Sequence, residues 1–180
     1  MHDHDPLVRL LDEARASDAG ATRGRERWLQ RQAEEGATLA GSLLDLAERR
    51  SLLALRTSSG RVSRGAVVAV GSDFVALGTP GSPTTCVRLA AITTVRPSGA
   101  ERHAAATGKR PPPLDLLLVE VLAGLAPVRP RVALVAGGEM VAGELWSVGA
   151  DVVTLRLDGE PDSVCYVAAT AIGEVLIEPV

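Results

Sequence analysis

The chain of 180 residues has few aromatic side chains, with one Phe, one Tyr and two Trp. Proteins that bind single-stranded nucleic acids stack bases on aromatic side chains, so this composition offers few platforms for base stacking. Asparagine is absent, and a single Lys accompanies 18 Arg. Any recognition that depends on an Asn side chain is therefore excluded.

Long apolar runs are also missing. No run approaches the ~20 apolar residues that a membrane-spanning helix needs, and the N-terminus does not carry a signal-peptide pattern. We therefore expect a cytoplasmic protein that does not insert into membranes.

Charge is divided unevenly along the chain. Residues 1–50 hold 8 basic and 10 acidic side chains, residues 51–110 hold 8 and 2, and residues 111–180 hold 3 and 10. The three segments therefore carry −2, +6 and −7, which sum to the net charge of −3. Such a division predicts a basic and an acidic part that meet each other, within one chain or between chains.

An internal repeat organises the sequence. Arg64–Leu77 reads RGAVVAVGSDFVAL, and Ala142–Leu155 reads AGELWSVGADVVTL. Several identities at a fixed offset indicate a duplicated structural unit. At an offset of 78 positions the identical pairs are Gly65 and Gly143, Val70 and Val148, Gly71 and Gly149, Asp73 and Asp151, Val75 and Val153, and Leu77 and Leu155.

The flanking sequences extend the repeat at offsets of 79 and 80, with Cys86 matching Cys165 at 79. We therefore expect two units with the same strand order. Gly65 and Gly143 should lie in the second strands, with Gly65 allowing a bend or bulge. Cys86 and Cys165 should take equivalent places in the fourth strands, as buried and reduced thiols. A disulfide would need them adjacent, which repeat symmetry alone does not provide.

Three segments have the pattern of helices. Asp5 and Pro6 form a helix start, followed by an apolar stripe to Ala14. A longer helix is predicted from about Thr22 to Glu48, where Gly36 bends or interrupts it. Leu114–Leu125 is apolar almost all round, which predicts a helix buried between the two units.

Short apolar segments separated by turn residues predict the strands. In the first unit they are Leu52–Arg56, Val62–Val70, Phe74–Leu77, Thr84–Leu89 and Ile92–Arg96. In the second they are Val132–Val135, Met140–Val148, Val152–Leu157, Ser163–Val167 and Val175–Ile177. The predicted fold is α+β and mainly β, with two repeated five-stranded barrels of the Sm-like or SH3-like kind. A helix precedes each barrel, and further helices lie at the N-terminus.

The predicted organisation has four parts. Residues 1–50 hold the N-terminal helices, and residues 51–97 form the first, basic barrel. Residues 98–113 form a flexible linker that ends in three prolines, and residues 114–180 contain a helix and the second, acidic barrel.

The first unit resembles the Sm-like family, which includes the bacterial RNA chaperone Hfq. The resemblance lies in a helix, a strand pair around a Gly, a turn with Asp before an apolar strand, and the closing segment Leu89–Ser98. This segment reads LAAITTVRPS and is similar to KHAISTVVPS in Hfq. The resemblance covers about Leu43–Pro97 and, more weakly, Leu122–Pro179. The tandem arrangement is also similar to proteins of GC-rich bacteria.

The residues with which that family reads RNA are not conserved here. Sm-like proteins use an Asn after the second strand, a place that falls near Asp73 or Ala76. The Lys–His pair of Hfq falls at Leu89–Ala90 and, in the second unit, within Val167–Ala169. The resemblance therefore implies the fold without the RNA readout.

No catalytic arrangement is evident. His2, His4 and His103 lie in the N-terminal tail and the linker, where nothing orients a general base. MHDHD at the N-terminus admits a metal site or, as we prefer, a frayed end. No phosphate-binding loop or metal-ligand spacing occurs. Asp73 and Asp151 are predicted to be turn residues and Phe74 to be a core residue, so we expect no enzyme, cofactor, metal or small-molecule substrate.

Two functions remain open. The first is an interaction or scaffold protein, a tandem Sm-like pseudo-dimer that binds protein partners or itself. The second is binding of RNA through arginines of the basic first unit: Arg56, Arg61, Arg64, Arg88 and Arg96. The acidic second unit would repel phosphate within a Debye length of about 8–10 Å, so we favour the first.

Overall fold

The computed structural model describes residues 24–98, 114–159 and 163–179. Residues 24–35 are helical and are followed by helix α2 (Leu39–Glu48). The predicted helix near Pro6, the MHDHD segment and most of the predicted linker lie outside the described residues. None of the described helices has the length and apolar character needed to cross a membrane.

The helix predicted from about Thr22 to Glu48 is interrupted near Gly36, as predicted, because the chain leaves the helical conformation at residues 36–38, before α2. Thr38 has extended backbone angles of φ −124° and ψ 153° and is the N-cap of α2. Its Oγ1 accepts a hydrogen bond from the Gly41 N–H at 3.0 Å. This cap fixes the start of the second helix.

The predicted strands are confirmed to within a residue or two, except for the last, which begins three residues earlier than predicted. In the first unit the strands are β1 (Leu52–Thr57), β2 (Val62–Val70), β3 (Phe74–Gly78), β4 (Thr84–Arg88) and β5 (Ile92–Pro97). In the second unit they are β6 (Arg131–Ala136), β7 (Glu139–Val148), β8 (Val152–Leu157), β9 (Val164–Ala168) and β10 (Ile172–Ile177).

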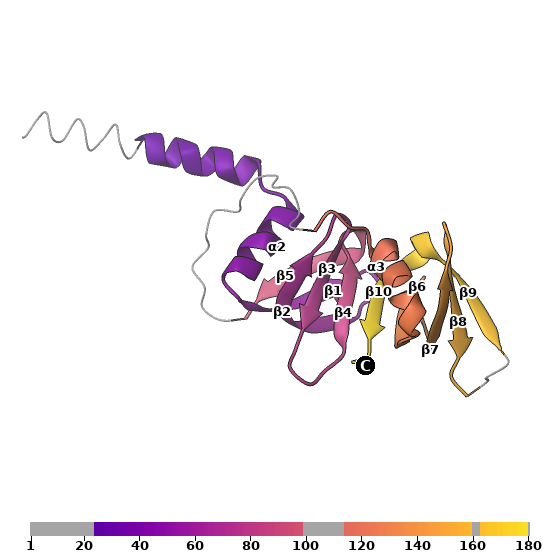
Figure 1. Cartoon of the computed structure of the whole chain (residues 1–180). Coiled ribbons are helices and arrows are strands. Elements are labelled where there is room, and N and C mark those ends of the chain that lie inside the picture. Colours follow the sequence, from indigo (N-terminus) through magenta and orange to yellow (C-terminus); the bar gives the residue numbers. More distant parts are fainter. Residues whose placement is uncertain (1–23, 99–113, 160–162, 180) are drawn as a thin grey trace, which may run out of the picture.

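All ten strands belong to one open antiparallel sheet, with the order β5-β1-β2-β3-β4-β10-β6-β7-β8-β9. The first unit therefore has the order 5-1-2-3-4, and the second repeats it as 10-6-7-8-9. The predicted duplication is confirmed at this level. Within the described residues each unit remains an open set of five strands, and the two units are joined by pairing of β4 with β10 (Figure 1).

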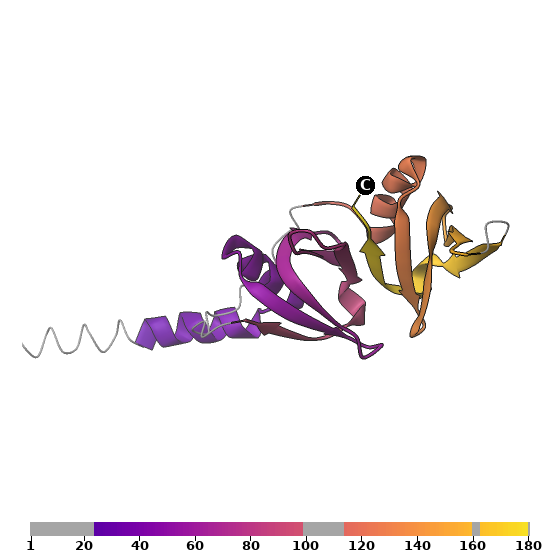
Figure 2. The same ribbon diagram turned by 90° about the horizontal axis from the view of Figure 1, so that it is seen from below.

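Both units are curved (Figure 2). The repeated glycines Gly65 and Gly143 lie where two strands of a unit approach each other closely. A Cβ atom at Gly143 would lie 2.1 Å from the Arg156 carbonyl oxygen, and one at Gly65 would lie 2.9 Å from the Gly78 oxygen. The bulge predicted near Gly65 lies further along the strand, between Val67 and Ala69. The second unit repeats it between Leu145 and Ser147.

The third predicted helix is shorter than its apolar pattern. Helix α3 spans Leu118–Leu125, and residues 114–117 precede it as irregular chain. Leu118 and Leu122 are buried, whereas Val121 and Leu125 are half-buried. The predicted burial of Leu117 is wrong, because it lies outside the helix and is 42% exposed.

The core of the second unit extends into the first. One cluster of buried side chains combines Leu118 and Leu122 of α3 with residues of β6–β10 and with Phe74, Ala76 and Cys86 of the first unit. A second cluster lies under α2 and includes Leu43, Leu53, Leu55 and Val75. Helix α3 therefore packs where the two units meet, as predicted, and Phe74 is a core residue.

We predict that Leu118→Ala lowers the free energy of unfolding by about 2–5 kcal/mol, because Leu118 is fully buried and its removal leaves a cavity. Leu39 begins α2 as Leu118 begins α3, but it is 40% exposed. Leu39→Ala is the matched control and should cost less than about 1 kcal/mol in the monomer. Urea unfolding measures both, and equal costs would contradict the burial of α3 between the units.

Candidate functional site: the joint and the two open edges

The joint is the antiparallel pairing of β4 with β10, together with the side chains around it. Glu174 lies opposite Val87, Val175 opposite Cys86, Leu176 opposite Thr85, and Ile177 opposite Thr84. It brings the basic first unit against the acidic second unit within one chain, as the charge distribution predicted. A strand of each unit that would otherwise be an open edge is thereby covered.

Asp73 connects the first unit to helix α3. Its Oδ1 accepts a hydrogen bond from the Leu118 N–H at 2.7 Å, at the N-terminus of α3. A carboxylate at this position satisfies a backbone donor that has no partner within the helix and interacts favourably with the helix dipole. Neighbouring contacts support the connection, since Ser72 N donates to Leu116 O at 2.9 Å. Asp73 is therefore a joint residue, a role beyond the predicted turn.

Arg88 completes the polar part of the joint. One terminal nitrogen donates to Asp73 Oδ2 at 2.8 Å, Nε donates to Ile172 O at 3.0 Å, and the other terminal nitrogen donates to Ala169 O at 3.1 Å. A single guanidinium thus holds the turn before β3 and the entry to β10. Its rigid, planar set of donors suits this geometry better than a Lys ammonium.

A second ion pair crosses the joint at Glu174. This carboxylate is only 1% exposed. It accepts hydrogen bonds from Ser63 Oγ at 2.9 Å and Arg61 Nε at 3.3 Å. A buried carboxylate is costly unless it is paired and hydrogen-bonded, and both of its oxygens have partners here. The pair favours this particular alignment of the two units.

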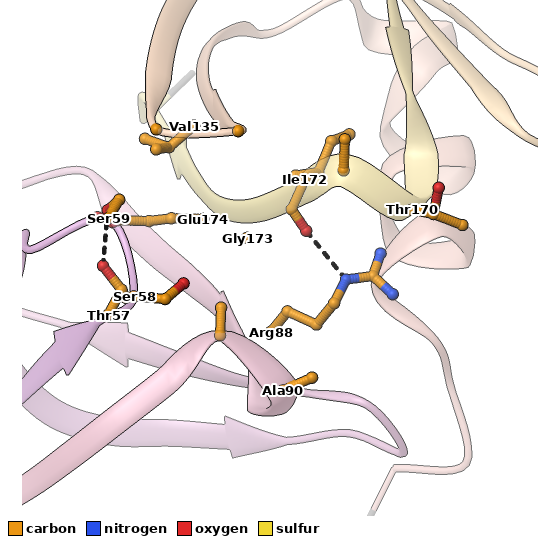
Figure 3. Close-up of a pocket in the computed structure, with 14 residues that line it drawn as sticks. Thr57, Ser58, Ser59, Arg88, Ala90, Val135, Thr170, Ile172, Gly173 and Glu174 are labelled. Carbon is orange, nitrogen blue, oxygen red and sulfur yellow. Dashed lines mark hydrogen bonds between the residues drawn. The ribbon is translucent and has the colours of Figure 1, made fainter.

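A cavity of about 460 Å³ lies beside the joint (Figure 3). Its lining includes the turn Thr57–Ser59, the segment Thr170–Glu174, and Arg88. Arg88 reaches the Ile172 carbonyl, on the side of the cavity away from Thr57 and Ser59 (Figure 3). The two charged lining residues, Arg88 and Glu174, are already paired within the joint, so the cavity lining presents no unpaired charged side chain.

The predicted equivalence of Cys86 and Cys165 is wrong by one residue. Ala76 lies opposite Cys86, and Thr154, its repeat counterpart, lies opposite Tyr166. The structural offset between β4 and β9 is therefore 80, and Tyr166 is the counterpart of Cys86. The extra residue falls in the turn between strands three and four, where a change in length does not disturb the pairing.

The strands at the two ends of the sheet each have a partner on one side only among the described residues. β5 pairs with β1, and β9 pairs with β8. We call their unpaired sides the β5 edge and the β9 edge. The exposed residues of β9 include Val164 and Tyr166, and Tyr166 is 72% exposed although its counterpart Cys86 is only 3% exposed. An edge with exposed apolar side chains can accept a further strand.

The arginines proposed for RNA do not form one surface with a common role. Arg61 and Arg88 are engaged in the joint, whereas Arg56, Arg64 and Arg96 are exposed.

The other predicted site residues have structural places. Gly65 and Gly143 allow two strands to approach closely, and Gly71 leaves no room for a Cβ because Phe74 would lie 2.1 Å away. Gly149 is exposed, as is Asp151. Glu174 was not among the predicted site residues, although a charge within an apolar segment was a signal for it.

Within the described ranges no group of three or more His, Cys, Asp or Glu side chains could hold a metal ion. Cys86 and Cys165 are free thiols. Burial raises the pKa of the Cys86 thiol to about 11, because an apolar environment disfavours the thiolate. At neutral pH Cys86 is thus a core thiol with little nucleophilic character.

Comparison with known proteins gives no assignment: no protein-family model and no curated protein matches the chain.

We predict that Asp73→Ala destabilises the protein far more than the matched change Asp151→Ala. Asp73→Ala leaves the Leu118 N–H and the Arg88 guanidinium without their carboxylate, which should cost about 2–4 kcal/mol. Asp151 is exposed in the monomer, so its loss should change stability by less than about 0.5 kcal/mol. Chemical denaturation at low protein concentration measures both, and similar values would refute the role of Asp73.

We also predict that the two thiols react at different rates with a thiol reagent. Cys165 should react first at pH 8, and Cys86 should react only as the protein opens, because it is buried and its pKa is about 11. Cys86→Ser should leave the fast phase intact, and Cys165→Ser should remove it. Two fast phases in the folded protein would contradict the burial of Cys86 by β10.

Proposed function

We propose that this protein is a non-enzymatic scaffold built as a tandem Sm-like pseudo-dimer, which binds protein by adding strands to the open edges of its sheet. The observation that carries the proposal is the joint itself. Pairing of β4 with β10 is edge-to-edge strand addition between two copies of one unit, and the same sheet retains two further edges. Strand addition is a general mode of peptide and protein recognition.

The repeated strand order supports the Sm-like assignment. Each unit places its fifth strand beside its first and leaves its fourth strand at the other side, and a short helix precedes each unit. The curvature of each half is consistent with a small barrel-like unit. The residues with which the family reads RNA have no counterparts in this chain, so the proposal takes from the family its architecture alone.

A proteomic pull-down tests the proposal. The full chain carrying Val95→Pro and Tyr166→Pro should lose proteins that the wild type retains, because both edges would lack a donor. Capture should persist after nuclease treatment. The control is Val68→Lys, a change at an exposed residue of the interior strand β2. If all capture disappears with nuclease, or if the edge variant captures the same proteins, the proposal fails.

RNA binding is the second candidate, and one observation favours it: Arg56, Arg64 and Arg96 remain exposed on the basic unit. Its weakness is that the basic unit, residues 51–97, exposes no aromatic side chain on which a base could stack, since the exposed Trp28 and Tyr166 lie outside it. Phe74 is buried, and two guanidinium groups cover Trp146, with Arg129 at 3.8 Å and Arg156 at 4.3 Å from the ring centre. Binding by the basic unit would therefore depend on charge alone.

If RNA binds, its affinity should fall steeply with salt, since each neutralised phosphate releases counterions. Arg64→Ala should weaken it, whereas Arg88→Ala would also disturb the joint and is unsuitable as a test. Filter retention of a single-stranded RNA at about 50 mM salt measures this. No retention at that salt concentration would remove RNA binding as a function.

A further inference from the structure

We propose that the outer face of strands β5, β1 and β2 is a docking surface for an acidic amphipathic helix of a partner protein. This surface is separate from the open edges of the sheet, so the inference goes beyond the proposed function. We call it the basic face and define it by its charged members Arg56, Arg64 and Arg96, all of which are exposed.

The strand register places the three arginines on one side of the sheet. Ala54 of β1 lies opposite Arg64 of β2 and also opposite Arg96 of β5. Arg56 lies two residues further along β1, and side chains two residues apart on a strand point to the same face. The residues on either side of Ala54 in the sequence are buried in the core of the first unit. The arginines therefore surround Ala54 on the outer face.

The charge of the basic face is not neutralised within the first unit. Asp73 is the only acidic residue among residues 51–98, and it is paired with Arg88. Within the described ranges, no carboxylate forms an ion pair with an arginine of the basic face. Arg56 donates a long hydrogen bond to the Gly60 carbonyl at 3.4 Å, which leaves its charge unpaired. Three like charges on one face repel one another, so an anionic partner stabilises them.

The second unit does not repeat this charge. At offsets of 79, 78 and 80 it has three apolar residues in place of the arginines, Val135, Ala142 and Leu176. Because apolar side chains occupy these positions in a unit with the same strand order, the fold does not require the charges. A contact that only the first unit makes accounts for them.

An apolar row borders the basic face. Leu52 is 58% exposed and lies opposite Ala66, two residues from Ala54 on the side away from Arg56. A bound nucleic acid would leave this row uncovered, and the first unit exposes no aromatic side chain for base stacking. An amphipathic helix can cover charged and apolar rows together. The combination therefore favours a protein helix over a nucleic acid.

The spacing of the arginines fits an α-helix that lies across the strands. Neighbouring strands are about 4.8 Å apart, so Arg96 and Arg64 are separated by about 10 Å across β1. Seven residues of helix advance about 10.5 Å, so carboxylates at positions i and i+7 match this pair. Arg56 lies midway between them and about 7 Å to one side, where position i+3 or i+4 reaches it. The other of these two positions then faces Leu52 and should be apolar.

Fluorescence anisotropy of a labelled probe peptide, titrated with the full chain, tests the proposal. The probe is an alanine-based helix of about 20 residues with Glu at i, i+4 and i+7 and Leu at i+3. A second probe exchanges the residues at i+3 and i+4. One of the two should bind with a Kd of about 10–100 μM, and more weakly as salt rises. Replacing each Glu by Gln, or spreading the same residues over all faces of the helix, should weaken binding at least about tenfold.

The chain offers controls matched in charge and exposure. Arg56→Gln, Arg64→Gln and Arg96→Gln together should weaken binding at least about tenfold. The control replaces three exposed arginines of the N-terminal helix by Gln, namely Arg25, Arg27 and Arg31. It changes the net charge equally and should leave the Kd within about twofold of the wild type. Leu52→Ser should also weaken binding, whereas Val128→Ser, at an exposed residue of the second unit, should not.

Circular dichroism and melting temperature check that every variant is folded. The proposal is overturned if neither probe binds at about 1 mM protein, if the redistributed peptide binds as well as the probes, or if the two triple variants weaken binding equally. A labelled single-stranded RNA is the competing ligand. If RNA binding needs the basic face and probe binding does not, the face belongs to nucleic acid and the proposal is wrong.

The outcome is independent of the sheet edges. Tyr166→Pro alters the β9 edge of the second unit and should leave probe binding unchanged. Loss of probe binding in the basic-face variant and loss of protein capture in the edge variant can therefore be told apart. Failure of the helix probes leaves the proposed function of the edges standing.

Discussion

The carboxylate of Asp73 holds helix α3 against the first unit, beside the ladder that pairs β4 with β10. One oxygen accepts from the first backbone N–H of α3, and the other accepts from Arg88, which in turn holds the carbonyls of Ala169 and Ile172. These bonds fix four parts of the chain relative to one another: the turn after β2, the end of β4, the start of α3 and the start of β10. Because the carboxylate and the guanidinium neutralise each other, the joint accommodates this pair of charges at modest cost. The continuous sheet and the shared apolar core depend on this alignment.

Duplication explains why the described sheet ends in two unpaired edges, at β5 and β9. Each unit has two different edges, one at its fourth strand and one at its fifth. The joint pairs the fourth-strand edge of the first unit with the fifth-strand edge of the second. One edge of each kind is therefore left over. The remaining pair lies at β5 and β9, with Leu39 and Tyr166 exposed where their counterparts are buried. Proteins usually protect open edges with charge or proline. Here only Arg96 and Pro97 serve that purpose on β5, and β9 has no charged residue between Val164 and Ala168.

Much of the fold could be predicted from the sequence, because alternating apolar residues and the identities at an offset of 78 positions are local signals. The strands and their repeated order follow from these. The joint could not be predicted in the same way, since pairing of β4 with β10 joins residues about 90 positions apart. The matching cysteines were misleading, because a one-residue difference in a turn shifted their register.

Differences between the repeats were the overlooked signal. Arg88 corresponds to Ala168, and Glu174 corresponds to Thr94, so the charged member of each pair lies at the joint. Two identical units need no such charges in their own cores, and a charge found in only one copy indicates a contact that only that copy makes. The length of α3 was overestimated for a related reason. Its apolar pattern continues to Leu114, but the helix begins where Asp73 caps it.

The central claim is that β4 and β10 form one continuous ladder, and amide hydrogen exchange of the monomeric chain tests it residue by residue. The backbone N–H groups of Cys86 and Val175 point into the joint in the observed register. They should be protected to nearly the free energy of global unfolding, as the amides between β1 and β2 are. The amides of Val164 and Tyr166, which point outward from β9, should exchange rapidly in the same sample. If Cys86 and Val175 exchange as fast as Val164 and Tyr166, the two units are not joined through their strands, and the account is wrong.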